Sequence, residues 1–255
     1  LGLVAGYHGM RGFWTSRDLD NWKVYDDKVP TNGDCPCPFE WNGHHYLFQG
    51  FNQFAYSPSG KPGTYVDWTK NGLAPYEGLS VPMVASFTGN RRILAGWLSH
   101  RDGWGGWLVF RELIQYPDGT LGQKWVPEIE PPVAPQTFTA QPGEPFRLVF
   151  RPASGTGSAL VFANDPAARE AAFRDDVPEV KWSVANRAEN FKIRRLPTFA
   201  SPYAVRVVSY YDRKSEDTIF DVEIGGARTM ICRRKGRFRA PEAGVASSKE
   251  KVDPK

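Results

Sequence analysis

Hydrophobic and polar residues alternate in short runs along most of the chain, and glycine, proline or asparagine separates the runs. Residues 81–87 and 92–98 form one pair of such runs, and residues 204–211 and 218–224 form another. Alternation with a period of two predicts half-buried β-strands, and short polar connections predict antiparallel pairing. Only residues 166–173 have helical character. The sequence therefore predicts an all-β protein with at most one short helix.

The stretch from residue 32 to residue 48 is the most informative for chemistry. It places Asn42-Gly43 between two aromatic-rich runs, which predicts a β-hairpin. Asp34 precedes the first of these strands, where burial among apolar side chains would raise the pKa of its carboxyl group and suit it to act as a general acid. The alternative is that Asp34 only caps a turn. Glu40 is the rival acid, although its place just before the hairpin turn predicts that it faces solvent.

The order of the strands predicts two domains and a tail. Residues 13–22 and 54–68 share an order of aromatic strand, serine, polar turn, aspartate and tryptophan. A repeat of about 40 residues is typical of a propeller blade. Prolines gather between residues 127 and 135, and the alternating strands beyond them predict a β-sandwich. Two copies alone do not establish a propeller, so from these patterns we expect a first β domain in residues 1–135, a sandwich in residues 136–240 and a disordered tail in residues 241–255.

Composition narrows the possible partners. The 255 residues carry a formal net charge of +4, and aromatic residues make up 14% of them. Basic and aromatic residues do not interleave along one surface, so the sequence does not predict nucleic-acid binding. No apolar run approaches the roughly 20 residues that a membrane-spanning helix needs. Oligomeric state cannot be read from the sequence.

The three cysteines, Cys35, Cys37 and Cys232, are an odd number and do not form a disulfide framework. Cys35 and Cys37 lie close to His44 and His45, which raises the question of a metal site. Their spacing lacks the usual pattern of two residues between zinc-binding cysteines, and a second cysteine pair does not follow. We expect no metal and no other cofactor, and we expect the two histidines to be surface or packing residues.

Three tryptophans could form a platform on which a sugar ring stacks: Trp97, Trp104 and Trp107. The alternative for Trp97 is packing within a blade, since aromatic side chains dominate protein cores. Trp104 and Trp107 lie in a glycine-rich segment, where exposed aromatic residues often serve binding. Arg111 is a further candidate for substrate binding. The alternative is that Arg111 and Glu112 are buried, paired and structural.

Several strings in order resemble the glycoside hydrolases with a five-bladed β-propeller, namely the β-fructosidase group of invertase, levanase and inulinase. The passage from Thr15 to Trp22 resembles the group's T-S-x-D-L-x-x-W string, and residues 33–36 (GDCP) resemble its Glu-Cys-Pro-Asp motif. Residues 91–97 (RRILAGW), 111–113 (REL) and 127–128 (PE) resemble strings of its last blades. The resemblance covers roughly residues 1–130, with a weaker echo near residues 221–234.

The resemblance implies an incomplete propeller of about three blades followed by a β-sandwich, with Asp34 as the acid/base. It also implies an oligosaccharide or polysaccharide substrate of the sucrose or fructan type, and an extracellular or periplasmic location. Asp34 stands where glutamate is usual in the group, and Cys37 stands where the motif ends in aspartate.

Such enzymes use two further carboxylates, in N-D-P and R-D-P motifs. Asn164-Asp165-Pro166 matches the first string but falls in the second half of the chain, so we treat the match as a coincidence. We therefore expect that the chain begins near the end of the second blade of a longer protein. The alternative function is a non-catalytic carbohydrate-binding protein that kept the propeller.

Overall fold

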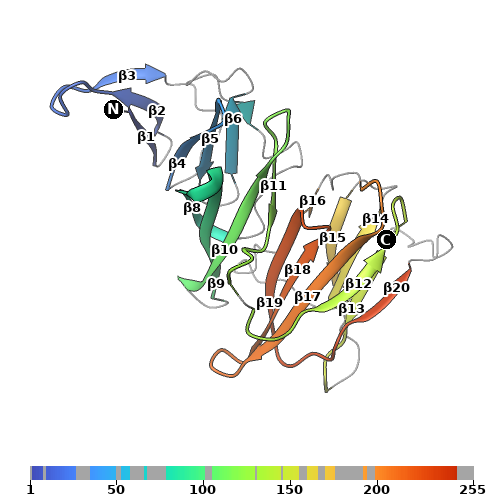
Figure 1. Ribbon diagram of the computed structural model, residues 1–255. Helices are drawn as coiled ribbons and strands as arrows, with labels where there is room; N and C mark the ends of the chain where they lie inside the picture. The colour runs from blue at the N-terminus through green and yellow to red at the C-terminus, as the bar shows by residue number, and fades with distance from the viewer. Residues whose placement is uncertain are drawn as a thin grey trace, which may run out of the picture. The chain divides into compact units, whose positions relative to one another are not determined.

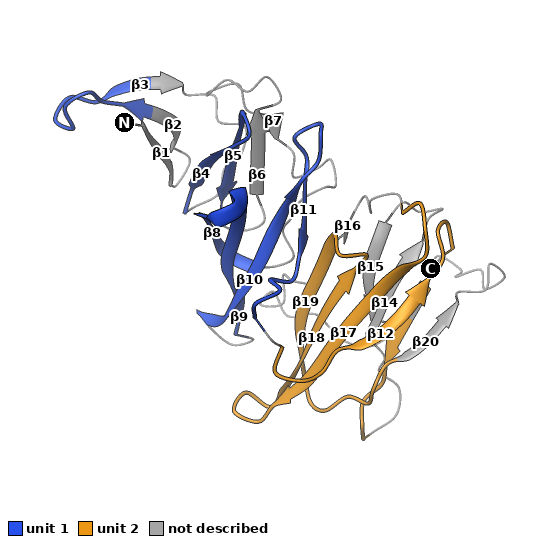
Figure 2. Ribbon diagram, in the orientation of Figure 1, with its two compact units in different colours: residues 1–129 blue, residues 130–255 orange. Residues whose placement is uncertain are grey.

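The computed structural model describes residues 2–7, 10–26, 35–49, 53–57, 66–67, 79–100, 105–129, 131–144, 146–154, 160–165, 170–175, 192–193 and 199–245. The chain forms two compact units, residues 1–129 and residues 130–255 (Figure 2). The division between the units lies within the proline-rich segment that begins at Pro127. Each unit is therefore described by itself.

The described part of unit 1 consists of three antiparallel sheets that follow one another along the sequence (Figure 1). In each sheet, every strand pairs with its neighbour in sequence. The first sheet contains β1 (Gly2–Tyr7), β2 (Met10–Thr15) and β3 (Lys23–Asp26). The second contains β4 (Cys37–Trp41), β5 (His44–Gln49), β6 (Gln53–Ser57) and β7 (Val66–Asp67). The third contains β8 (Leu79–Phe87), β9 (Arg91–Ser99), β10 (Gly106–Gln115) and β11 (Leu121–Lys124), with the short 3-10 helix η1 (Thr88–Asn90) between β8 and β9.

The predicted hairpin at Asn42-Gly43 is confirmed. Strands β4 and β5 pair from Cys37 with Phe48 to Trp41 with His44, which leaves these two residues as the turn. Asn42 has φ of 49° and Gly43 has φ of 77°. A two-residue turn with positive φ at both positions matches the twist of the strands it joins, and asparagine and glycine adopt it at low cost.

A polar network joins the second sheet to the third. The indole nitrogen of Trp41 donates to the carbonyl of Asn90 at 3.0 Å, and the amide of Asn42 donates to Gln115 Oε1 at 2.7 Å. Gln115 Nε2 in turn donates to the Tyr46 hydroxyl at 2.6 Å. We call these five residues the inter-sheet network. They fix the β4–β5 hairpin against the third sheet at the end of the sheets where this hairpin turns.

Unit 2 is a sandwich of two antiparallel sheets. One sheet has the order β12 (Gln136–Ala140), β17 (Tyr203–Asp212), β18 (Asp217–Ile224) and β19 (Arg228–Lys235). The other has the order β16 (Lys192–Ile193), β15 (Glu170–Asp175), β14 (Leu160–Asp165), β13 (Phe146–Phe150) and β20 (Glu242–Val245).

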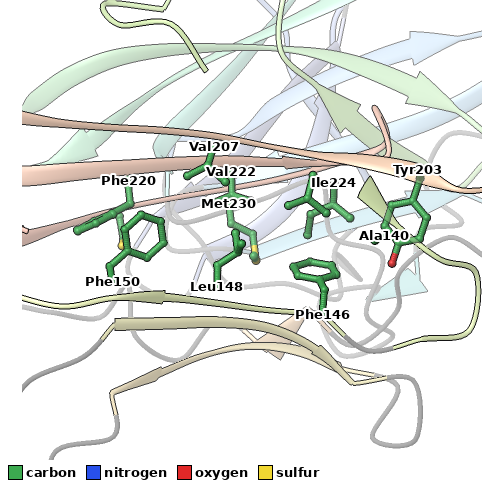
Figure 3. Close-up of a cluster of buried hydrophobic side chains, with 12 residues drawn as sticks. Ala140, Phe146, Leu148, Phe150, Tyr203, Val207, Phe220, Val222, Ile224 and Met230 are labelled. Carbon is green, nitrogen blue, oxygen red and sulfur yellow. The ribbon is translucent and has the colours of Figure 1, made fainter. Parts of the chain in front are cut away.

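The core of unit 2 lies between these two sheets. Phe146, Leu148 and Phe150 alternate along β13 and point toward the buried side chains of β17, β18 and β19 (Figure 3). The rings of Phe150 and Phe220 meet edge to face, with centroids 4.7 Å apart. Alternation with a period of two on both sheets is what allows the two apolar faces to meet.

Two predictions about unit 2 are wrong in part. The helix expected in residues 166–173 is contradicted by β15, which begins at Glu170 and pairs with β14. Alanine favours helix there, but propensity is weak beside the pairing offered by neighbouring strands. The tail expected to be disordered from residue 241 includes β20, whose four residues pair with β13.

Among the described residues, no helix is long and apolar enough to cross a membrane.

The sandwich core predicts a contrast between two neighbouring positions of β13. Leu148→Ala should lower the free energy of unfolding of unit 2 by about 2–5 kcal/mol, because it removes a side chain that is 1% exposed and leaves a cavity. Val149→Ala, on the opposite and less buried face, is the control and should cost clearly less. Urea titration followed by circular dichroism measures both. Equal costs at the two positions would contradict the placement of the core.

Candidate functional site

Strands β4 and β8 run in the same direction where the second and third sheets meet. The backbone N–H of Val84 donates to Cys37 Sγ at 3.2 Å, near the start of β4, and Trp41 at the end of β4 reaches the carbonyl of Asn90, just beyond β8. Cys35 and Pro36, which precede β4, therefore lie toward the end of the third sheet where β8 begins, β9 ends and β10 begins. We call this the site end, and the inter-sheet network lies at the opposite end.

Asp34 and Trp104, two of the predicted site residues, lie outside the described residues. Their nearest described neighbours in the sequence are Cys35 and Gly105. Cys35 follows Asp34, is exposed and has φ of 51°, an uncommon value for a residue other than glycine. Gly105 follows Trp104, and its carbonyl accepts from the N–H of His100 at 2.9 Å in the loop between β9 and β10. Both predicted residues thus adjoin the site end in sequence.

Trp97 and Trp107 point to opposite faces of the third sheet. Trp97 pairs with Leu108, whereas Trp107, the residue before Leu108, pairs with Leu98. Side chains of successive strand residues alternate between faces. The structure therefore does not bring these two tryptophans onto one platform. Trp107, which is 36% exposed, lies on the face turned toward the second sheet.

Arg111 lies on the same face as Trp107 but deep between the sheets. It pairs with Leu94 in the ladder and is 3% exposed. Its Nη1 donates to the carbonyl of Phe110 at 3.1 Å. Glu112, on the other face, pairs with Arg91 at 2.7 Å. This burial favours the structural alternative of the sequence analysis for Arg111 over contact with a substrate.

Three other polar residues near Asp34 in the sequence, Glu40, His44 and His45, are exposed to solvent or pack against neighbouring residues. Glu40 is exposed, as expected, and its carbonyl accepts from Arg92 Nη2 at 3.1 Å. His44 and His45 are both half-buried. The ring of His44 lies so close to Gly119 that a β-carbon at position 119 would clash with it. Gly119 also has φ of 81°, so both the backbone conformation and the lack of space favour glycine at this position.

Sequence analysis missed two features of the site end. Val81 has φ of 49° within an irregularity of the β8–β9 ladder, and strain in a β-branched residue is unusual enough to mark a functional region. Beside it, the hydroxyl groups of Ser80 and Ser99 lie 2.8 Å apart. Pro82 lies within this irregularity, and a proline inside a strand is the sequence signal that could have indicated the bulge.

The thiol of Cys37 takes the position of the carboxylate that ends the resembled motif. The side chain is buried, and this burial raises the pKa of the Cys37 thiol, against the opposing effect of the hydrogen bond from Val84. A neutral, buried thiol cannot supply the negative charge of an aspartate. Among the described residues, no group of three or more His, Cys, Asp or Glu side chains could hold a metal ion.

The turn that resembles T-S-x-D-L-x-x-W is held by its own polar side chains. Ser16 Oγ accepts from the N–H of Leu19 at 2.8 Å, and Asp18 Oδ1 accepts from the N–H of Asn21 at 2.8 Å. Hydrogen bonds from Asn21 and Ser16 lower the pKa of the Asp18 carboxyl. The indole nitrogen of Trp22 donates to the Leu19 carbonyl at 2.8 Å. The residues of this string therefore shape a turn.

Three further strings meet in one ion-pair cluster of the third sheet. Arg91 from the RRILAGW string donates to Glu112 of the REL string at 2.7 Å and to Glu128 of the PE string at 2.6 Å. Lys124 Nζ lies 3.3 Å from Glu112 Oε1. We call Arg91, Glu112, Lys124 and Glu128 the charged cluster. It ties β9, β10 and β11 to the segment that leaves the sheet.

No family model and no curated protein matches the sequence. Among solved structures, a GH32 beta-fructofuranosidase from Bombyx mori matches 96% of this chain with a TM-score of 0.55 and 13% identity. An exo-inulinase from Aspergillus awamori matches 92% of the chain at 12% identity, with a TM-score of 0.47. A beta-fructofuranosidase from Schwanniomyces occidentalis, complexed with fructosyl-erythritol, matches 92% at 10% identity, also with a TM-score of 0.47.

The similarity to the Bombyx mori enzyme shows the fold of this chain. The chain has the all-β fold of the GH32 beta-fructofuranosidases, with antiparallel propeller-type sheets followed by a β-sandwich. The predicted fold class is therefore confirmed. The chain spans about 62% of the length of that enzyme.

The burial of the cysteines predicts a difference in their reactivity. Cys35 is exposed, whereas Cys37 and Cys232 are buried. In the folded protein, a maleimide should label Cys35 and leave the other two unmodified, because labelling needs an accessible thiolate. Peptide mapping by mass spectrometry measures each site, and labelling in guanidinium, where all three should react, is the control. Labelling of Cys37 as fast as Cys35 in the folded protein would contradict its place between the sheets.

The charged cluster predicts a pH dependence of stability. Hydrogen bonds from Arg91 lower the pKa of the Glu128 carboxyl to about 2, from a usual value of 4.5. Because the folded-state pKa lies below the unfolded one, this stabilisation is present above about pH 4.5 and is lost as the pH falls toward 2. The difference in unfolding free energy between the native protein and Glu128→Gln should therefore shrink over that interval.

Urea titrations at a series of pH values measure this difference. Glu144→Gln changes an exposed glutamate of unit 2 and is the matched control, which should leave the unfolding of unit 1 unchanged at every pH. A difference between the native protein and Glu128→Gln that stays constant down to pH 2 would show that the ion pair does not contribute.

Proposed function

We propose that this chain is part of a glycoside hydrolase of the β-fructosidase type, which hydrolyses or transfers glycosyl bonds in saccharides such as sucrose or fructans. Asp34 is its acid/base. The observation that carries the proposal is that Asp34 directly precedes Cys35 in the sequence, and Cys35 lies at the site end of a chain whose fold is that of the GH32 beta-fructofuranosidases. The motif in the sequence and the fold of the chain support this proposal.

The features of the site end suit a carbohydrate. Trp107 offers a partly exposed indole on the face turned toward the second sheet, and Trp104 belongs to the loop beside it. An aromatic face packs on the apolar C–H surface of a sugar ring, as it does on other apolar groups. Ser80 and Ser99 lie at the same end but on the opposite face of the third sheet, beside Trp97, so they are not part of this surface. Trp97 faces the other side of the sheet, so we assign the stacking role to Trp104 and Trp107 alone.

The proposed reaction needs two carboxyl groups, one on either side of the scissile bond. In a retaining glycosidase, one carboxylate attacks the anomeric carbon while the other group, which is protonated, donates its proton to the leaving oxygen. This acid/base group then takes a proton from the attacking water. Asp34 would donate and recover that proton. The nucleophile and the transition-state stabiliser lack counterparts of their motifs here, so we propose that they belong to sequence outside these 255 residues. The 255-residue chain by itself should then be inactive.

One observation favours the alternative of a carbohydrate-binding protein without catalysis. The position of the motif's final aspartate holds Cys37, which is buried and carries a thiol of raised pKa. In addition, the aspartate at position 34 is one methylene shorter than glutamate, and proton transfer requires approach to about 3 Å. Under this alternative, the complete protein binds fructosyl saccharides and does not turn them over.

Asp34→Asn in the complete protein tests the role of Asp34. The amide keeps the shape of the side chain but cannot release a proton, so hydrolysis of sucrose or inulin should fall by about 10²–10⁴-fold. Sugar affinity should stay within a few-fold. Aryl glycosides with good leaving groups should lose less, because their departure needs less protonation. Steady-state kinetics and isothermal titration calorimetry measure the rate and the binding.

Glu40→Gln is the matched control, since Glu40 is an exposed carboxylate on the strand that follows Asp34. It should leave the rate unchanged. Loss of stability with an unchanged rate in Asp34→Asn would show that Asp34 caps a turn. Binding of sugar without turnover by the unmodified complete protein would establish the carbohydrate-binding alternative.

A further inference from the structure

Basic side chains gather at one end of unit 2, the end where β17 and β19 finish and β18 begins (Figure 1). All of them are exposed except Arg234, which is half-buried. A concentration of like charge on a surface creates a local potential that attracts groups of the opposite charge. We call this set the basic end, and its members are Arg151, Arg213, Lys214, Arg234, Lys235, Arg237 and Arg239.

A short backbone bridge brings two of these arginines opposite each other. Pro152 pairs with Phe238, and the N–H of Arg239 donates to the carbonyl of Arg151 at 2.8 Å. Phe238 packs its ring against Phe220 in the sandwich core, with centroids 5.1 Å apart, whereas both arginines are exposed. Like charges opposite each other on neighbouring strands destabilise a sheet. This arrangement is therefore better suited to binding an anion than to stabilising the fold.

The β17–β18 hairpin, which carries residues 213–214, lies beside the same segment. The N–H of Gly236 donates to the carbonyl of Glu216 at 2.8 Å, which holds the end of β19 against this hairpin. The guanidinium group of Arg237 lies 4.6 Å from the ring centroid of Tyr211 near the end of β17. A cation over an aromatic face is attracted to it, so this contact restricts Arg237 while leaving it exposed.

The acidic residues near the basic end are fewer, and two of them are engaged locally. Asp212 accepts hydrogen bonds within the hairpin, and Asp217 is buried 3.2 Å from Arg233. Glu216 is exposed in the same hairpin. In the other sheet of unit 2, β15 ends at Asp175, two strands away from β13. Positive charge therefore remains in excess at the basic end.

The surroundings of the basic end favour one class of anionic partner. Among the described residues, the large apolar side chains that are exposed all lie outside residues 146–154 and 203–240. Binding in a membrane interface uses apolar side chains that insert, and binding of single-stranded nucleic acid uses aromatic platforms for the bases. Tyr211 is half-buried and already in contact with Arg237. Guanidinium groups, in contrast, match the geometry of carboxylate and sulfate groups.

We propose that the basic end binds an acidic polysaccharide, whose charged groups repeat along the chain and contact several of these basic side chains at once. Each exposed ion pair is weak, but contacts made by one polymer reinforce one another. The inference goes beyond the proposed function, because this surface belongs to unit 2 and takes no part in the reaction assigned to Asp34. It holds the protein on an acidic matrix.

Calorimetric titration with sodium alginate, a polymer of carboxylated sugars, tests the proposal. The protein should bind alginate at low salt, and the binding should weaken steeply as sodium chloride is raised, because salt screens exposed charges. Highly esterified alginate keeps the sugar backbone without most of the charge and should bind far more weakly. Because binding is measured without turnover, the outcome of the Asp34 experiment does not affect this result.

Paired substitutions locate the binding surface. Arg151→Gln with Arg239→Gln should raise the Kd for alginate by about fivefold or more, since two ion-pairing groups are lost together. Arg17→Gln with Lys23→Gln is the matched control, which removes the same charge from exposed positions of unit 1 and should change the Kd less than about twofold.

A second pair keeps the test decisive if the first variant does not fold. Arg213→Gln with Lys214→Gln changes two exposed side chains of the hairpin and should also weaken binding, again by about fivefold. Circular dichroism checks that each variant is folded.

Several results would overturn the inference. One is no binding of alginate at low salt, and another is an equal loss of affinity in the control and the basic-end variants, which would reflect net charge alone. Equal binding of alginate and its ester would remove the role of charge. Tighter binding of single-stranded DNA, or of vesicles that contain phosphatidylserine, would make a nucleic acid or a membrane the partner.

Discussion

The packing of β4 against β8 is the contact on which the candidate site depends. Because the two strands run in the same direction, the segment before β4 and the loop between β9 and β10 come to the same end of their sheets. The hydrogen bond from Val84 to Cys37 holds one end of this contact, and the bond from Trp41 to Asn90 holds the other. If β4 ran the opposite way, Cys35 would lie beside the inter-sheet network, far from Trp107.

Two groups of residues through which the sequence resembles the β-fructosidases have structural roles. Ser16, Asp18 and Trp22 shape a turn, and Arg91, Glu112 and Glu128 form an ion-pair cluster. Polar side chains in such places satisfy backbone groups at turns and tie strands together at the rim of a sheet. These residues therefore carry information about the fold, which this chain shares with the Bombyx mori enzyme at 13% identity.

Arg111 and Cys37 show how burial separates structural chemistry from catalytic chemistry at this site. Both fall in or beside strings of the resemblance, and both are buried where the second and third sheets meet. A guanidinium at 3% exposure contributes to packing and hydrogen bonding, and a buried thiol contributes as a small apolar group with weak hydrogen-bonding capacity. Under the proposed function, substrate contact falls to residues at the site end, where β8 and β10 begin and β9 ends.

The sequence by itself determined the all-β class and the hairpin at Asn42-Gly43. These features depend on local periodicity and turn chemistry, which each segment carries in its own residues. Tertiary structure decided the rest, because it depends on partners distant in sequence. Pairing with β14 made a strand of the alanine-rich segment at β15, and the register of β9 with β10 turned Trp97 and Trp107 to opposite faces. Spacing along one strand cannot fix which face its neighbours cover, so only the stacked sheets decided that Arg111 is buried and Leu108 is exposed.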